Sequence, residues 1–194
     1  MDSPRLSLSA HSSPSRPSHY SFDERFTQLL SNALLRLAKT GTRRQDGSDD
    51  EFSTKKGDPL ASIPLAQYLR RIFQYCNYND DEDNEKDGAY SPSAQALVCT
   101  LVYIDRIVRD GKTTVHLGNV HRLLAMGMLL AFKMNEDFSV PMPLFAKITG
   151  IPLYELGVME LKMLQWLGFC ATVSKQEYDS RLAMFVHRMR PRPL

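Results

Sequence analysis

Residues 94–108 constrain the fold most strongly, because their apolar side chains lie on nearly all sides of the helix that the pattern predicts. Ser91 and Pro92 precede this stretch in an order typical of a helix start, with Ser91 as N-cap and Pro92 as the first helical residue. Gly111 follows it, and glycine suits the left-handed residue that ends a helix. A helix that is apolar all round must be covered by other elements, so we predict a central helix within a larger bundle.

Further stretches with apolar residues at helical spacing could supply the covering elements. They lie at residues 22–39, 65–73, 117–134, 144–149, 153–167 and 175–189. No stretch alternates apolar and polar residues between turn signals, as a half-buried strand would. We therefore predict an all-α fold with five core helices, one extra N-terminal helix before them and a short C-terminal helix after them.

The composition between these helices predicts the domain organisation. Ser and Pro dominate the first residues, which cannot build a packed element, and polar glycine-containing residues follow the first helix. The predicted units are a disordered tail at 1–20, the N-terminal helix at 21–40, a linker at 41–62, the helical core at 63–170, and a C-terminal helix with a basic tail at 171–194.

Two segments outside the helices carry other signals. Ser3 and Ser13 each precede a proline, so they are candidate sites for a proline-directed kinase, although such pairs also arise by chance in a tail of this composition. Residues 79–88 are rich in Asp and Glu and are predicted to form an exposed acidic loop between the first and second core helices.

The composition also limits the function classes. Three cysteines without a CxxC pair predict neither a disulfide framework nor a zinc site, and they favour an intracellular location, in the nucleus or the cytoplasm. The formal net charge is +2, so no nucleic-acid partner is expected, and no apolar run is long enough to predict a membrane span. Phosphate-binding, hydrolase and metalloprotease motifs do not occur, so we predict no catalytic residue, cofactor or metal.

Three charged residues lie within or at the end of apolar helices. A buried Asp105 would need a cationic partner, and Arg70 or Arg71 on the preceding helix could supply one as a structural ion pair. A direct contact between Asp105 and a partner protein is the alternative. Lys133 and Glu160 could each be solvated, and sequence spacing does not by itself place them side by side.

Four groups of residues occur in the order and spacing of a known family. They are Tyr68-Leu69-Arg70-Arg71-Ile72; Tyr103-Ile104-Asp105-Arg106; Val120-His121-Arg122-Leu123-Leu124 with Ala131-Phe132-Lys133; and Ile148-Thr149-Gly150-Ile151 with Glu155-Leu156, Glu160-Leu161 and Leu164 up to Phe169. Together they resemble the cyclin box of the P-type cyclins, also called U-type, which are relatives of the yeast cyclin that serves phosphate sensing. The resemblance covers the core at 63–170.

This resemblance implies a five-helix cyclin fold that docks on the regulatory C-helix of a cyclin-dependent Ser/Thr protein kinase and activates it, in cell-cycle or nutrient signalling. It implies that a charged Lys–Glu pair bonds kinase backbone within an apolar interface. The residues that it places at the kinase are Lys133, Met134, Glu160, Leu164 and Phe169. It also favours Arg71 over Arg70 as the partner of Asp105.

The chain departs from the family pattern in two places. The acidic loop is longer than the family's, and the segment 69–73 differs from the Met-Arg-Ala-Ile-Leu segment of cell-cycle cyclins, so substrate docking through an Arg-x-Leu groove is not expected. Two alternatives stay open: a transcription-associated protein with a cyclin box, and a scaffold that does not activate a kinase.

Overall fold

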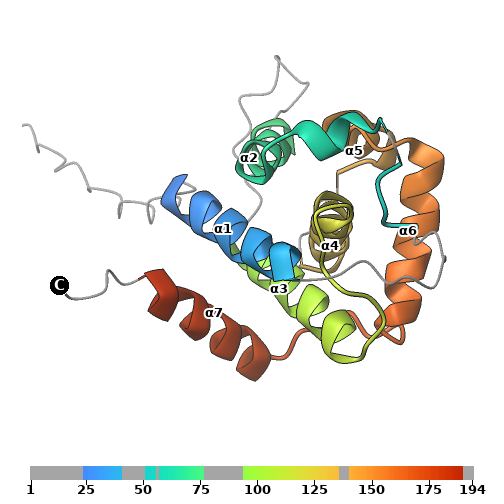
Figure 1. Cartoon of the computed structure of the whole chain (residues 1–194). Coiled ribbons are helices and arrows are strands. Elements are labelled where there is room, and N and C mark those ends of the chain that lie inside the picture. The colour runs from blue at the N-terminus through green and yellow to red at the C-terminus, as the bar shows by residue number, and fades with distance from the viewer. Residues whose placement is uncertain (1–23, 41–50, 56, 77–93, 136–139, 190–194) are drawn as a thin grey trace, which may run out of the picture.

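The computed structural model describes residues 24–40, 51–55, 57–76, 94–135 and 140–189, and every regular element in these ranges is a helix (Figure 1). The prediction of an all-α fold is confirmed. None of these helices is both long and apolar enough to cross a bilayer. Ser3, Ser13 and the acidic segment 79–88 lie outside the described residues.

In chain order the elements are α1 (Glu24–Thr40), the 3-10 helix η1 (Pro59–Ser62), α2 (Leu65–Cys76), α3 (Ala94–Arg109), α4 (Val120–Asn135), α5 (Met142–Thr149), α6 (Leu153–Trp166) and α7 (Lys175–Met189).

The central position predicted for residues 94–108 belongs to α4 instead. All residues of α4 from Val120 to Phe132 are buried, and Figure 1 shows this helix with α2, α3, α5 and α6 around it. Helix α3 packs extensively on α4, but its opposite side carries Asp105 and the exposed Val108. The apolar pattern of residues 94–108 therefore predicted correctly a helix that packs in the core. The few charged residues of α3 lie on one side, and that side faces away from α4.

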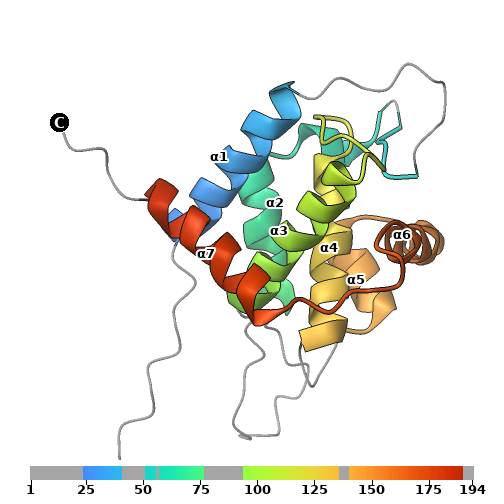
Figure 2. The same ribbon diagram turned by 90° about the horizontal axis from the view of Figure 1, so that it is seen from below.

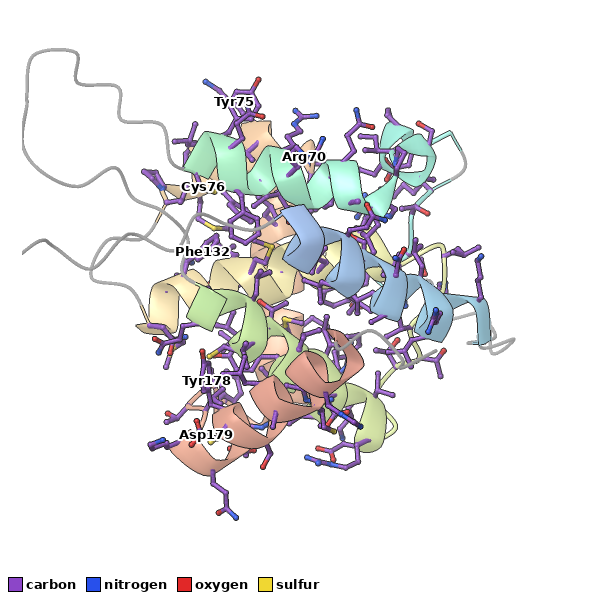
Figure 3. All side chains as sticks on the ribbon, turned by 90° about the vertical axis from the view of Figure 1, so that its left-hand side faces the viewer. Arg70, Tyr75, Cys76, Phe132, Tyr178 and Asp179 are labelled. Atoms are coloured by element: carbon purple, nitrogen blue, oxygen red, sulfur yellow. The ribbon has the colours of Figure 1, made fainter. Side chains whose placement is uncertain are left out.

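Helix α2 is amphipathic and joins the core to α5. Figure 3 shows Arg70 and Tyr75 pointing away from the bundle, while Cys76 points toward it. The ring of Tyr68 is fully buried, and its hydroxyl donates to the carbonyl oxygen of Thr149 at 3.2 Å. Since Thr149 ends α5, this bond ties the two helices together.

Gly127 allows α3 and α4 to pack closely. A Cβ atom at this position would lie 2.7 Å from Cγ2 of Thr100, which is buried in α3. Thr100 does not turn away freely, because its hydroxyl donates to the carbonyl oxygen of Ala96 at 2.8 Å. At this separation of the helices, only glycine fits without a shift of its neighbours.

Gly127→Ala is therefore expected to lower the free energy of unfolding by about 1 to 2 kcal/mol, because the added methyl group overpacks the contact by more than alanine gains in helix propensity. Urea unfolding followed by circular dichroism measures the change. Adding Thr100→Ser removes the opposing methyl group and should recover most of the loss. Unchanged or raised stability of Gly127→Ala alone would contradict this account of the contact.

The described residues between 51 and 62, predicted as a linker, cover part of the helical core. Phe52 is fully buried, and its ring stacks on that of Trp166 with the centroids 4.9 Å apart. Asp58 caps η1, because its carboxylate accepts a hydrogen bond from the backbone N–H of Leu60 at 2.9 Å. This stretch is thus packed against α6, and η1 holds Asp58 in a defined place.

Helix α7 is fastened to α3 by Arg106. The guanidinium donates to both carboxylate oxygens of Glu177 at 2.9 Å, and to the carbonyl oxygens of Cys170 and Thr172 at 3.0 Å. Hydrogen bonds from Arg106, together with those from the side chain and backbone of Ser174, lower the pKa of Glu177 to about 2. Helix α7 consequently lies along α3, away from α6, as Figures 1 and 2 both show.

Candidate partner-binding site

Lys133 and Glu160 meet at the surface, where the end of α4 lies beside the middle of α6. Nζ of Lys133 donates to Oε1 of Glu160 at 2.5 Å. The two side chains are 31% and 20% exposed, so water reaches the pair without surrounding it. Charge-assisted hydrogen bonds of this kind are among the stronger ones, and partial burial reduces their screening by salt. The structure thus brings together two residues that sequence spacing could not place side by side.

The pair owes its position to buried neighbours. Lys133 lies in the last turn of α4, where the helix dipole favours a cation, and it directly follows the fully buried Phe132. Glu160 directly follows Met159, which is buried in the core. Since the packing of Phe132 and Met159 orients both helices, the two charged side chains emerge at the boundary between core and solvent.

Three apolar residues predicted to share the interface lie on the same two segments. Met134 follows Lys133 and is exposed, and Leu164 is half-buried one turn beyond Glu160 on α6. Phe169 lies in the turn after α6, where its backbone N–H donates to the carbonyl oxygen of Leu164 at 2.8 Å. The positions of these residues suit a common surface, and their contact with a kinase stays a prediction.

The backbone of Phe169 is in the left-handed region, with φ at 57°. It is the one non-glycine residue with positive φ in the described part of the chain, and it follows Gly168, whose φ is 61°. Such a conformation costs a residue with a Cβ atom roughly 1 to 2 kcal/mol. The Phe169 side chain is nevertheless 67% exposed. The turn therefore presents a large apolar side chain to the outside rather than burying it.

Helix α6 exposes more apolar surface than its sequence pattern predicted. Of the apolar residues that recur along 153–167, Leu156 and Met159 are buried, but Leu153 and Leu161 are exposed. The periodicity of this helix could not show which of its apolar residues face the core, because apolar side chains occur on several sides.

Asp105 does not pair with Arg71, so this prediction is wrong. The carboxylate of Asp105 is partly exposed and pairs with Arg181 of α7, and more loosely with Arg109 one turn along α3, at 3.9 Å. Arg71 instead donates to the carbonyl oxygen of Lys147 in α5 at 3.2 Å. The reason is that α2 packs against α1 and α5, whereas Asp105 lies on the side of α3 that faces α7.

Arg122 forms a buried ionic cluster to which sequence analysis assigned no role. Its guanidinium is 4% exposed and donates to Oε2 of Glu155 at 2.6 Å and to Oδ2 of Asp58 at 3.1 Å. Lys55 also bonds Glu155, at 3.1 Å. Burial raises the pKa of Glu155, but Arg122 and Lys55 outweigh burial and lower it below its usual value. The sequence contained one signal for this cluster, which is the position of Arg122 at the start of a long apolar run. A cation buried there needs carboxylate partners.

His121 is a buried histidine at the start of α4. Its Nε2 donates to the carbonyl oxygen of Ile63 at 2.8 Å, and its Nδ1 has no hydrogen-bond partner among the described residues. Burial lowers the pKa of His121, and the opposing effects of the Ile63 carbonyl and the Asp58 carboxylate are smaller. The folded protein therefore favours the neutral imidazole.

Stability is expected to fall as the pH is lowered from about 7.5 to about 5.5, through the unfolded pKa of histidine near 6.5. Because the folded pKa of His121 is the lower one, the unfolded chain takes up the proton first, and acid favours unfolding. In His121→Gln, whose amide can still donate to Ile63, the decline in melting temperature over this range should be smaller. Equal declines in the two proteins would show that His121 does not cause the effect.

Comparisons with known proteins show what this chain is similar to. The protein-family model described as cyclin matches residues 9–171, a range that includes the whole site. Cyclin-U4-1 of Arabidopsis thaliana is 31% identical over 155 residues, which cover 78% of this chain and 70% of that protein. Cyclin-U1-1 of the same plant is 33% identical over 161 residues, covering 80% and 70%. PHO85 cyclin-like protein psl1 of Schizosaccharomyces pombe is 27% identical over 174 residues, covering 81% and 65%. The predicted resemblance to this branch of proteins is confirmed.

Proposed function

Because the chain belongs to the cyclin family, whose members are regulatory subunits rather than enzymes, we propose that it binds a cyclin-dependent Ser/Thr protein kinase and activates it by docking on the C-helix of the kinase. The name of the fission-yeast relative, a PHO85 cyclin-like protein, supports a partner of this class. The chain would act inside the cell, in the nucleus or the cytoplasm, in cell-cycle or nutrient control.

The observation that carries this proposal is the Lys133–Glu160 pair. An ammonium group has three donors and a carboxylate has about four acceptor sites, so the bond between them leaves both groups able to bond a partner as well. Exposed Met134 directly follows Lys133, and exposed Phe169 lies in the turn after α6, the helix that carries Glu160. Methionine and aromatic side chains are enriched in protein interfaces, and charged groups with spare bonding capacity beside them can bond a partner that covers them.

Docking at this surface can activate a kinase without any chemistry on this chain. A protein kinase transfers phosphate only when its β3 lysine pairs with the C-helix glutamate and its activation loop is in place. A subunit that binds the inward position of the C-helix more tightly than the outward one shifts the kinase toward the active state. A tenfold preference for the active state corresponds to about 1.4 kcal/mol, which a few contacts can supply.

The proposal is tested by producing each cyclin-dependent kinase of the source organism and measuring its Kd for the full chain. We expect at least one of these kinases to bind with a Kd below about 1 μM. Phosphate transfer by that kinase to a Ser-Pro peptide should increase when the chain is added. If no kinase in the panel binds, the proposed function is wrong, and a scaffold or a transcription-associated role becomes the better explanation.

A further inference from the structure

Helix α6 has an outer face without charge between Leu153 and Leu161. Because a helix turns once in 3.6 residues, residues four apart form rows along its surface. One row contains Leu153, Gly157 and Leu161 and then Gln165, and the next contains Tyr154 and Val158 and then Lys162, which pairs with Glu51. The five residues of these rows up to Leu161 are exposed, and Tyr154 is exposed by 81%. A surface helix ordinarily turns polar residues to water, so these five residues, the outer face of α6, suit a partner better than solvent.

Gly157 lies in the middle of this face, and the folded chain itself gives no reason for a glycine there. Its φ is that of an ordinary helical residue, since it is not among the glycines with positive φ. A Cβ atom at this position would meet no heavy atom within 4 Å. In a helix interior glycine is more destabilising than any residue other than proline. Gly127 differs in this respect, because the close contact with Thr100 explains it.

A missing side chain in a row of leucines makes a notch in the ridge that the row forms. Helices pack with the ridges of one in the grooves of the other, and their separation depends on the side chains at the crossing point. A notch between Leu153 and Leu161 lets a second helix approach the backbone of α6 closely, with apolar side chains on both sides of the crossing.

We propose that Gly157 is the point at which the partner kinase crosses α6, and that an apolar helix of the kinase occupies the outer face of α6. This inference rests on the proposed function. The occupant is the kinase because Gly157 lies one turn before both Glu160 and Leu161, in the row adjacent to that of Glu160 and Leu164. A helix that covers the Lys133–Glu160 pair therefore extends over the notch as well.

Gly157→Ala gives effects of opposite sign on stability and on binding, measured on the full chain with the kinase that binds wild type most tightly in the panel. The melting temperature of the free protein rises, because alanine favours the helix and its methyl group meets no neighbour. The Kd for the kinase rises at least about tenfold, because the methyl group fills the notch. Gly157→Leu, whose larger side chain blocks the crossing, raises the Kd further, and its melting temperature verifies that it folds.

Ser180→Ala is the matched control. Ser180 is exposed on α7, away from α6, so its replacement also raises helix propensity without touching the outer face. We expect an unchanged Kd for this variant.

Three results would overturn the inference, and each points to a different explanation. If Gly157→Ala and Gly157→Leu both keep the wild-type Kd, the kinase does not cross at Gly157, while the proposed function stands. If wild type self-associates in sedimentation and Gly157→Leu abolishes this without changing the Kd, the occupant is a second copy of the chain. If no kinase of the panel binds wild type, the proposed function fails and this inference fails with it.

Discussion

Replacement of Lys133 by alanine is expected to raise the Kd for the partner kinase about 30- to 700-fold, equivalent to roughly 2 to 4 kcal/mol. The loss has two sources. The kinase groups that bond Lys133 lose their partner, and Glu160 is left as an uncompensated charge beneath the bound kinase. Glu160→Ala should produce a loss of similar size. Biolayer interferometry with the immobilised kinase measures both values.

The free protein should tolerate these changes, since a partly exposed ion pair contributes at most about 1 kcal/mol to stability. The pair Lys175–Asp179 on α7 is a matched control, because its atoms are 2.7 Å apart and both side chains are exposed. Figure 3 shows Asp179 on the outer side of α7. Removal of this control ion pair should leave the Kd for the kinase unchanged.

The exchanged variant Lys133→Glu with Glu160→Lys separates partner binding from internal pairing. It retains an ion pair between α4 and α6, so the melting temperature should stay close to that of wild type. Kinase binding should still be lost, because each charge now faces groups that complement the opposite one. Wild-type affinity of the exchanged variant would mean that the pair serves only to join the two helices.

Replacement of Arg122 by leucine is expected to lower the free energy of unfolding by about 3 to 5 kcal/mol. The guanidinium is almost fully buried and bonds two carboxylates, one on α6 and one at the start of η1. Its removal leaves Asp58 and Glu155 as mutually repelling, partly buried charges, and it releases the residues around η1 from α4. Urea unfolding at neutral pH gives the change in free energy.

A variant that also carries Asp58→Asn and Glu155→Gln should recover much of this loss, because removing all the charges is far less costly than removing one partner. Lys55→Ala provides the contrast, since Lys55 is exposed and bonds the same Glu155. Its effect should stay below about 1 kcal/mol. A loss below about 1 kcal/mol for Arg122→Leu would contradict the assignment of this cluster as the anchor of η1.

The sequence was sufficient to predict the helices, because each has a stripe of apolar residues and most have recognisable ends. The start of α4 shows the limit of this approach. Apolar spacing suggested a helix from 117, but α4 begins at Val120. The side chain of Asn119 accepts a hydrogen bond from the backbone N–H of His116 and donates to the carbonyl oxygen of Thr114, which holds a turn at this point. Such local bonds compete with the helix, and apolar periodicity does not report them.

Contacts between helices could be predicted less well, because they depend on how the helices are arranged. Asp105 was expected to reach α2, yet it faces α7 and pairs with Arg181. The resemblance to a family supplied the pairing of Lys133 with Glu160, which the spacing alone could not. It did not supply the outer face of α6, because exposure of Tyr154 and Leu161 is a property of the packed bundle.

The central claim is that docking at the Lys133–Glu160 surface activates a kinase, and the rate of phosphate transfer tests it most directly. The kinase that binds most tightly is assayed on a Ser-Pro peptide alone, with wild type, and with the Lys133→Ala, Glu160→Ala double variant, all at equal concentrations. We predict that wild type increases the rate by at least about tenfold and that the double variant leaves it near the level of the kinase alone. A kinase that binds wild type without any gain in rate, or that the double variant activates equally well, would contradict the claim.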